Sequence, residues 1–309
     1  MKIVWLGHNM KRRIPFSPYS YCMQVEMSKL ANVVFYGGGG GKFIPEFDVE
    51  KIVGKEQPDV LVFFNNQKSF VNISKVKTPK YCKCSDPHEP NFSRHIVFIN
   101  KYKADLTSIC CCEGIMEKYK AKTKQRIVYL PDATCSAFFK DLGLKRDLDV
   151  YFAGSSNHKT YPLRARLITK LSKEKQIKFL LRHSEVQNVS EVEWEHQLTR
   201  YVIELNRAKI TPFGTSIYNY ALRRFGEGMA CNSLVLAPVP KDANFLHFIP
   251  NKNFIQINML NFMEKIHYYL KHENERKTIA KKGLETIKKY HTVKIRAKQL
   301  YDYLREIIE

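Results

Sequence analysis

Residues 223–238, RRFGEGMACNSLVLAP, place two arginines and one glutamate directly before an apolar run. An acidic residue is favourable in the first turn of a helix, so Glu227 could serve only to complement a helix dipole. In doubly wound α/β folds, however, ligands lie outside the carboxyl ends of the strands, and a carboxylate there can accept both hydroxyls of a ribose. We therefore expect Glu227 to bind a nucleotide.

A second stretch, YFAGSSNHKTYPLRARL at residues 151–167, has the chemistry of an anion site. A strand, a glycine, two serines and a following helix let backbone N–H groups and a helix dipole receive an anion. The expected turn consists of Gly154, Ser155 and Ser156. Arg164 and Arg166 fall early in the helix, and a guanidinium binds phosphate through two parallel hydrogen bonds. Because residues at positions i and i+2 point to different sides, we expect at most one of them to face the phosphate.

The stretch CSDPHEP carries candidates for proton transfer. Asp86 and His88 follow a short apolar run, and the two prolines make their loop rigid. Either side chain could act as the general base that takes the proton of an acceptor hydroxyl, a role worth about 10²–10⁴-fold in rate. The alternative, that Asp86 caps a helix and His88 is an ordinary loop residue, remains open. His8 and Asn9, after the first strand, are further candidates for contact with acceptor or donor.

The same region contains possible metal ligands. Cys82, Cys84, His88 and His95 do not have the pair spacing of a zinc site, and we expect the cysteines to be structural. Cys82 and Cys84 should point to the same side of a strand. We expect no metal in the chemistry, with Lys and Arg side chains neutralising a departing diphosphate instead.

Short apolar runs alternate with helical stretches along the whole chain, which predicts crossover connections and parallel sheets. The fold class is therefore α/β, with two Rossmann-like doubly wound domains in tandem. We expect an N-terminal domain over residues 1–145, a C-terminal domain over 146–290 and a closing helix over 291–309, which would pack back on the N-terminal domain. The linker should lie near Leu142–Asp147, and a ligand should bind in the cleft between the domains.

The chain has 309 residues, of which 44% are hydrophobic, so it can fold into two domains with their own cores. No apolar run approaches the ~20 residues of a membrane span, and the first strand is too short for a signal peptide. Eight cysteines, three of them consecutive at 110–112, do not form spaced pairs. We expect reduced thiols and a cytoplasmic protein.

RRFGEGMACNSLVLAP resembles the R-x-F-E-A-M-A-C-G segment of GT-B glycosyltransferases, especially the family 1/4-like proteins related to the spore-maturation protein CgeB. The segments PKYCKCSDPHEP, RIVYLPDATC, DVYFAGSSNHKTYPLRARL and HTVKIRAKQLYDYL are similar to other parts of that family, so the resemblance covers most of the chain. Three positions depart from the pattern. Asn219 stands where retaining members carry a second glutamate, Asn232 replaces a glycine, and Gly226 interrupts the R-x-F-E spacing.

The resemblance implies a GT-B glycosyltransferase whose co-substrate is a UDP- or GDP-linked sugar. It implies that Glu227 binds the ribose and that Arg224 and the Gly154–Ser155 turn lie by the diphosphate. Tyr218 and one of the two helix arginines would complete the anion site. The acceptor would be a hydroxyl of a lipid-linked or cell-surface glycan. The missing glutamate at Asn219 leaves open a catalytically silent module that only binds a nucleotide or sugar.

The net charge of +21 predicts an anionic partner. We favour peripheral contact with an anionic membrane at its inner face, through Lys118–Arg126 and Lys11–Arg13. A transferase that acts on modified DNA bases is the rival enzyme, and its binding would depend steeply on salt. A DNA-binding protein without enzymatic activity is less favoured, because no helix-turn-helix, zinc-finger or RNP-like segment occurs.

Overall fold

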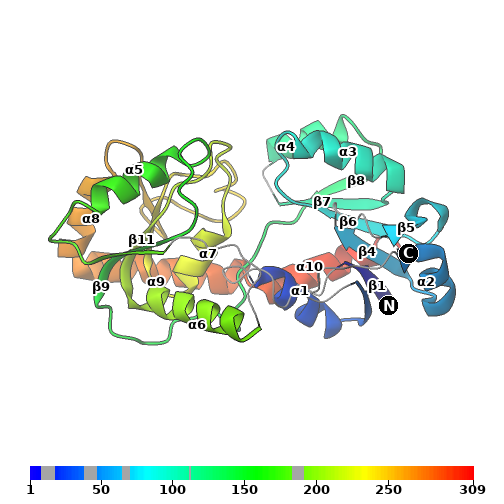
Figure 1. The fold of residues 1–309 in the computed structure, drawn as a ribbon, viewed down its shortest axis with the longest axis horizontal. Coiled ribbons are helices and arrows are strands. Elements are labelled where there is room, and N and C mark those ends of the chain that lie inside the picture. The colour runs from blue at the N-terminus through cyan, green and yellow to red at the C-terminus, as the bar shows by residue number, and fades with distance from the viewer. Residues whose placement is uncertain (8–17, 38–46, 65–69, 111–112, 183–190) are drawn as a thin grey trace. The chain divides into compact units, whose positions relative to one another are not determined.

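The computed structural model describes residues 1–7, 18–37, 47–64, 70–110, 113–182 and 191–309 (Figure 1). The chain forms two compact units. The first combines the described residues of 1–132 with Val293–Glu309, and the second comprises the described residues of Ala133–Thr292. The C-terminal helix is therefore part of the first unit, and the residues between Ala133 and Asp147 are part of the second.

The first unit is built on a six-stranded parallel sheet with the order β2-β1-β4-β6-β7-β8. Its strands are β1 (Lys2–Leu6), β2 (Asn32–Tyr36), β4 (Val60–Phe64), β6 (Lys80–Cys84), β7 (Leu106–Ile109) and β8 (Arg126–Tyr129). Its helices are α1 (Tyr19–Ser28), α2 (Val49–Glu56), α3 (Asn91–Tyr102), α4 (Glu113–Lys120) and α10 (Val293–Arg305). A short pair, β3 (Phe47–Asp48) and β5 (Phe70–Val71), and a 3₁₀ turn at Ile73–Lys75 complete it.

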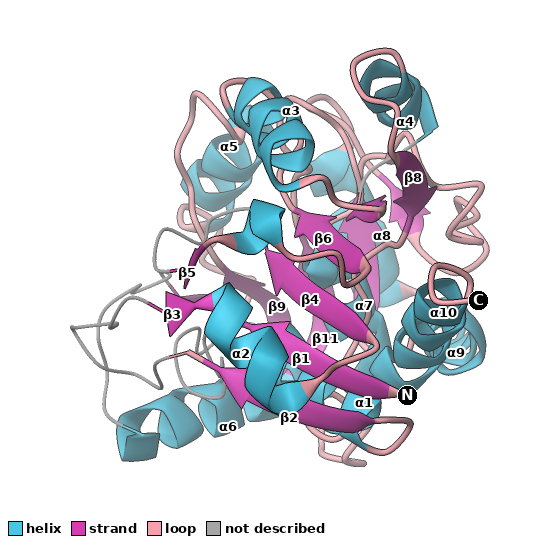
Figure 2. Cartoon of the chain, turned by 90° about the vertical axis from the view of Figure 1, so that its right-hand side faces the viewer, coloured by secondary structure: helices cyan, strands magenta, loops and turns pink. Residues whose placement is uncertain are grey.

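Both faces of this sheet are covered, as the runs of consecutive apolar residues in its strands require. One face packs on α2, α3 and α4 through a core that includes Ile52, Ile99 and Tyr119. Helices α1 and α10 pack on each other. Figure 2 shows α2 in front of β1 and β2. The doubly wound fold predicted from the sequence is confirmed in this unit.

The second unit contains a five-stranded parallel sheet with the order β10-β9-β11-β12-β13. Its strands are β9 (Leu148–Ala153), β10 (Phe179–Arg182), β11 (Ala208–Pro212), β12 (Leu234–Ala237) and β13 (Ile255–Gln256). Its helices are α5 (Pro162–Leu171), α6 (Glu191–Arg207), α7 (Arg223–Ala230), α8 (Phe262–Lys271) and α9 (Glu273–Tyr290). Since all five strands run in parallel, their carboxyl ends lie at one edge, where the loops that lead into α5 and α7 begin.

Alternation along β9 assigns its side chains to opposite faces. Val150 belongs to the core that α5 and α8 form with the sheet. Tyr151, the next residue, contacts Tyr201 of α6 on the other face. Helices α7 and α9 pack on each other and on β12. Tyr201, Arg224 and Glu227 of the candidate site come from α6 and α7, whereas Arg164 comes from α5.

Two details differ from the sequence predictions. The stretch VEWEHQLTRYVIELNRAKI at residues 192–210 is predicted from the sequence to be helical throughout, but helix α6 ends at Arg207 and β11 begins at Ala208. Pairing of β11 with β9 and β12 on both sides outweighs the weak local preference of these residues for helix.

The cysteines also differ from expectation in part. Cys82, Cys84, Cys110 and Cys231 are free thiols, but Cys22 and Cys135 are disulfide-bonded, so the prediction of reduced cysteines is wrong for these two. Sequence spacing could not reveal this, because a disulfide depends on which residues the fold brings together. In the part of the chain that the structure describes, no helix is long and apolar enough to cross a membrane.

Candidate functional site

The site begins at the carboxyl end of β9, where the chain turns at Gly154. This glycine has φ +133°, a conformation that residues with a side chain rarely adopt. A Cβ atom placed on it would lie 3.3 Å from Nη2 of Arg224. The glycine therefore lets the guanidinium of α7 lie directly against the β9 turn. Two residues that the sequence assigned to the diphosphate, Gly154 and Arg224, are in contact.

Arg164 lies at the same turn. It is buried, with an exposed fraction of 6%, although it occupies the first turn of α5. Its Nε donates to the carbonyl of Gly214 at 2.7 Å and its Nη1 to the carbonyl of Ser155 at 3.2 Å. Its guanidinium also stacks on the ring of Tyr161, 3.7 Å from the centroid. Arg166 is exposed, so the two arginines point to different sides, as their spacing predicts.

The guanidinium groups of Arg164 and Arg224 affect each other. Burial and, to a lesser extent, the positive charge of Arg224 lower the pKa of Arg164 to about 10, against an opposing contribution from Tyr161. Burial alone would also lower the pKa of Arg224, but Tyr201 and Glu227 outweigh it, and the pKa is raised. Two cations held close together in a partly desolvated place repel each other, and a bound anion would relieve that repulsion. The turn therefore has the electrostatics of an anion site.

Glu227 lies on α7, one turn after Arg224. It is the fifth residue of the helix, not a residue of its first turn, so complementing the helix dipole does not account for it. The carboxylate is buried, with 4% exposure, and its Oε2 accepts a hydrogen bond of 2.7 Å from the Tyr201 hydroxyl. The same hydroxyl accepts a bond of 2.6 Å from Nη1 of Arg224. Glu227 is thus joined to the anion site through one tyrosine.

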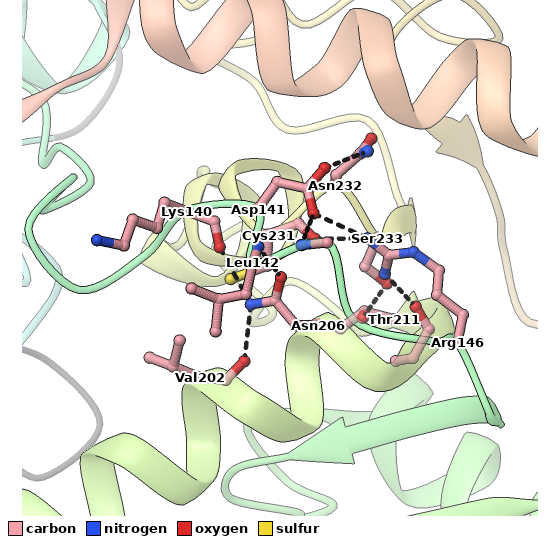
Figure 3. Close-up of polar contacts among 12 residues, drawn as sticks. Lys140, Asp141, Leu142, Arg146, Val202, Asn206, Thr211, Cys231, Asn232 and Ser233 are labelled. Atoms are coloured by element: carbon pink, nitrogen blue, oxygen red, sulfur yellow. Dashed lines mark hydrogen bonds and ion pairs between the residues drawn. The ribbon is translucent and has the colours of Figure 1, made fainter.

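The C-terminal end of α7 is held by the segment that precedes β9 (Figure 3). Nη2 of Arg146 donates to the carbonyl of Cys231 at 2.8 Å, and its Nη1 donates to Ala208 at 2.6 Å. Asn232 has φ +55° and donates through Nδ2 to Asp141 at 2.8 Å. Asparagine is the residue that best replaces glycine in this left-handed conformation, which explains why Asn232 can stand where the family pattern has glycine.

Gly226 is explained by a close approach. A Cβ atom on this residue would collide with Oγ1 of Thr134. Thr134 is buried, and its backbone N–H donates to the carbonyl of His291 at 2.8 Å. The glycine inside the R-x-F-E spacing therefore makes room for the segment that enters the second unit. It places α7, with Arg224 and Glu227, directly against that segment.

The loop between β11 and α7 contains Tyr218 and Asn219. Asn219 has φ +55°, accepts a bond from Thr215 Oγ1 at 2.8 Å and donates to the carbonyl of Val239 at 3.1 Å. Its amide therefore ties this loop to the one after β12. Tyr218 is partly exposed on the same loop.

The first unit carries the candidates for proton transfer. Asp86 is exposed and His88 partly exposed, in the loop after β6. Asp86 has φ +51°, and its carbonyl accepts a bond of 2.9 Å from the N–H of His88. The residue that caps α3 is Pro90, so Asp86 is not the helix cap. His8 and Asn9 lie outside the described residues.

Among the described residues, no group of three or more His, Cys, Asp or Glu side chains could hold a metal ion. The sulfur atoms of Cys82 and Cys84 are 4.0 Å apart and buried, on one side of β6 as predicted. Burial raises the pKa of Cys84, but hydrogen bonds from Cys82 and His95 outweigh it and bring the pKa to about 6.

A D-x-D spacing does occur, at Asp147 and Asp149. Asp147 pairs with Arg207 through two bonds of 2.7 and 2.8 Å, and Asp149 pairs with Lys209 at 2.7 Å. Both lie at the start of β9, whereas Gly154 follows its carboxyl end. Asp147 and Asp149 therefore pair with other side chains and lie at the opposite end of β9 from the anion site.

The sequence did not reveal three polar residues near the site. Tyr201 and Glu204 lie on α6, and Arg182 ends β10. Nε and Nη2 of Arg182 form a bidentate pair with the buried Glu204, at 2.5–3.1 Å. The carbonyl of Arg182 accepts a bond of 3.1 Å from the N–H of Gly154. A tyrosine on the apolar face of a helix is expected to be a core residue. Only its tertiary contacts identify Tyr201 as part of the site.

Residues 163–302 match a family model described as glycosyl transferase-like. No match is found among curated proteins.

Solved structures match over the whole chain. A glycosyltransferase from Rickettsia africae aligns with a TM-score of 0.69 at 11% identity, over 100% of this chain and 98% of its own. HepE from Anabaena, in complex with UDP-glucose, aligns with a TM-score of 0.68 at 15% identity, over 99% of this chain and 100% of its own. Sucrose-phosphate synthase from Thermosynechococcus elongatus aligns with a TM-score of 0.67 at 11% identity, over 99% of this chain and 98% of its own. The relation to CgeB finds no support among these matches. The chain has the GT-B fold, and its residues 163–302 match a family of glycosyl transferase-like proteins.

Proposed function

We propose that this protein is a glycosyltransferase that takes its sugar from a UDP-linked donor bound to the second unit. One observation carries the proposal. Two guanidinium groups, from α5 and α7, converge on the Gly154–Ser155 turn, and the carboxylate of Glu227 is linked to one of them through Tyr201. This arrangement offers positive charge to a diphosphate and a carboxylate to a ribose. HepE, which has a similar fold, was solved in complexes with UDP and with UDP-glucose.

In the proposed reaction, the acceptor hydroxyl attacks the anomeric carbon and the bond from that carbon to the diphosphate breaks. The proton of the hydroxyl passes to a general base, and UDP leaves with the bonding electrons. Arg164 and Arg224 stabilise the negative charge that develops on the diphosphate. Asp86 or His88 of the first unit is the candidate base. No metal is part of this proposal, because the two arginines supply the positive charge.

The test is a comparison of Arg164→Gln with Arg166→Gln, which lies two residues away on the same helix but is exposed. Hydrolysis of UDP-glucose, followed by release of UDP, reports donor use without knowledge of the acceptor. We expect kcat/KM to fall about 10- to 100-fold in Arg164→Gln, from the loss of hydrogen bonds to a charged group, and to stay near wild type in Arg166→Gln. Equal rates in the two variants would remove Arg164 from the donor site. If the protein binds UDP but hydrolyses or transfers no UDP-linked or GDP-linked sugar, the silent binding module is the better account.

For the acceptor, we propose a lipid-linked or cell-surface glycan reached by peripheral contact with an anionic membrane. Lys118, Lys122 and Lys124 are exposed on and after α4. Their neighbours Lys120 and Arg126 pair with Glu117 and Glu306, whereas no acid of the described residues pairs with these three. Three lysines near an anionic surface contribute about 1 kcal/mol each. Lys11–Arg13 lie outside the described residues.

Flotation with vesicles of phosphatidylglycerol and phosphatidylcholine tests the membrane contact. Changing Lys118, Lys122 and Lys124 to Ala should weaken binding roughly 100-fold, which is the loss that about 3 kcal/mol predicts. A matched triple variant at Lys170, Lys173 and Lys175, which are exposed in the second unit, should keep it. Absence of flotation, together with a salt-dependent gel shift on duplex DNA, would favour the DNA-modifying transferase instead.

A further inference from the structure

The hydroxyl of Tyr201 occupies a position between the two side chains assigned to the donor. It lies 2.7 Å from Oε2 of Glu227 and 2.6 Å from Nη1 of Arg224. A guanidinium cannot accept a hydrogen bond, so the hydroxyl must accept from Arg224. Its single proton is then directed to the carboxylate. Both bonds involve a charged partner, which makes them stronger than bonds between neutral groups.

Packing contacts hold the ring of Tyr201 in place. The side chain is 1% exposed and contacts the rings of Tyr151 and Phe139, with centroids 6.1 and 5.8 Å away. The guanidinium of Arg224 also lies over the ring, 4.9 Å from its centroid. Burial raises the pKa of Tyr201 well above its ordinary value of 10.0, so the hydroxyl is protonated at neutral pH. A rigid, protonated hydroxyl can hold both partners in one geometry.

Glu227 and Arg224 are assigned to different parts of the donor, the ribose and the diphosphate. A movement of either side chain must change its bond to the shared hydroxyl and hence the position of the other. We propose that Tyr201 is a positioning residue of the donor site, whose hydroxyl couples recognition of the ribose by Glu227 to recognition of the diphosphate by Arg224. The inference rests on the proposed function, since it concerns how the same donor is held.

The first experiment compares Tyr201→Phe with wild type in the titration of UDP. The variant keeps the ring and its packing and removes only the hydroxyl. We expect the dissociation constant for UDP to rise about 10- to 100-fold, as for loss of bonds to charged groups. The KM for UDP-glucose should rise in parallel, while kcat changes less than threefold, because the variant alters donor binding and not the proton transfer. Tyr81→Phe is the matched control, since its buried hydroxyl bonds Ser108 Oγ at 2.5 Å in the other unit.

The second experiment measures the coupling itself and does not require that Tyr201→Phe be stable. Glu227→Gln, Arg224→Gln and the double variant are titrated with UDP in the wild-type background. If the two residues act together, the double variant should lose less affinity than the product of the single losses. In the Tyr201→Phe background, the loss of UDP affinity in the double variant should equal the product of the losses in the two single variants.

The outcomes separate this inference from the function on which it rests. If Glu227→Gln and Arg224→Gln both leave UDP binding unchanged, the donor site itself is wrong. If they weaken it, but Tyr201→Phe binds UDP as wild type does or the losses multiply in the wild-type background, only the positioning role is overturned.

Discussion

Nη2 of Arg224 lies 3.3 Å from the position that a Cβ atom would occupy on Gly154, so the absence of a side chain at the β9 turn decides where the guanidinium rests. An alanine there would press on the guanidinium and strain a backbone that has φ +133°. We expect Gly154→Ala to weaken UDP binding at least 10-fold, a shift of about 1.4 kcal/mol, in a calorimetric titration.

The matched control for this prediction is Gly143→Ala. Gly143 also has a positive φ, +66°, but no atom lies within 4 Å of the position of its Cβ. This variant carries the backbone strain without the contact, and its UDP affinity should stay near that of wild type. Comparable losses in both variants would show that strain alone, and not the position of Arg224, weakens binding.

The candidate general base leads to a prediction about the rate of sugar transfer rather than about donor binding. Asp86 and His88 belong to the first unit, after β6, whereas the donor is assigned to the second. Asp86→Asn or His88→Gln should lower the kcat of sugar transfer by about 10²–10⁴-fold, with UDP affinity unchanged. His267→Gln, at an exposed histidine of α8, serves as the control. If neither loop variant changes kcat, the base lies elsewhere.

The stability of the second unit should depend on the contact between Gly226 and Thr134. A methyl group added at Gly226 would overlap Oγ1 of a buried threonine. We expect Gly226→Ala to lower the free energy of unfolding by about 1–3 kcal/mol, as overpacking usually does, measured from urea denaturation.

Rescue tests the cause of that loss. Thr134→Ala removes the overlapping hydroxyl, so the double variant should recover part of the stability that Gly226→Ala loses. A double variant less stable than Gly226→Ala alone would mean that overlap with Thr134 is not the reason for the glycine.

Acid should weaken the start of β9. Hydrogen bonds from Arg207 and its charge lower the pKa of Asp147 to about 2, below its ordinary value of 3.8, so the folded state favours the ionised carboxylate. The stabilising contribution is therefore present above pH 3.8 and is lost as the pH falls toward 2. The urea midpoint of Asp147→Asn should lie below that of wild type at pH 6 and approach it at pH 3. A gap that stays constant between these pH values would contradict the assignment.

The fold and most of the second unit's site could be predicted from the sequence, because both depend on local patterns. The strands are short apolar runs followed by turn residues, and in a parallel sheet such turns must meet at one edge. The resemblance to GT-B glycosyltransferases, rather than the pattern itself, implies that Gly154 and Arg224, which are far apart in the sequence, lie together. The opposite orientations of Arg164 and Arg166 follow from helix geometry alone.

The parts that could not be predicted depend on tertiary contacts. Tyr201 lies on the buried face of α6 like any core aromatic, and only the fold brings its hydroxyl to Glu227. The glycine at 226 has its explanation in Thr134, which enters from a distant segment. The disulfide-bonded state of Cys22 and Cys135 likewise has no signature in their spacing.

The most direct test of the donor site is the calorimetric titration of UDP into wild type and Glu227→Gln, with Glu264→Gln, an exposed acid of α8, as the control. The substitution keeps the size of the side chain and removes the charge that is assigned to the ribose hydroxyls. We predict a dissociation constant about 10- to 100-fold higher for Glu227→Gln and a value near that of wild type for Glu264→Gln. Equal affinity of Glu227→Gln and wild type would contradict the assignment of this carboxylate to the nucleotide.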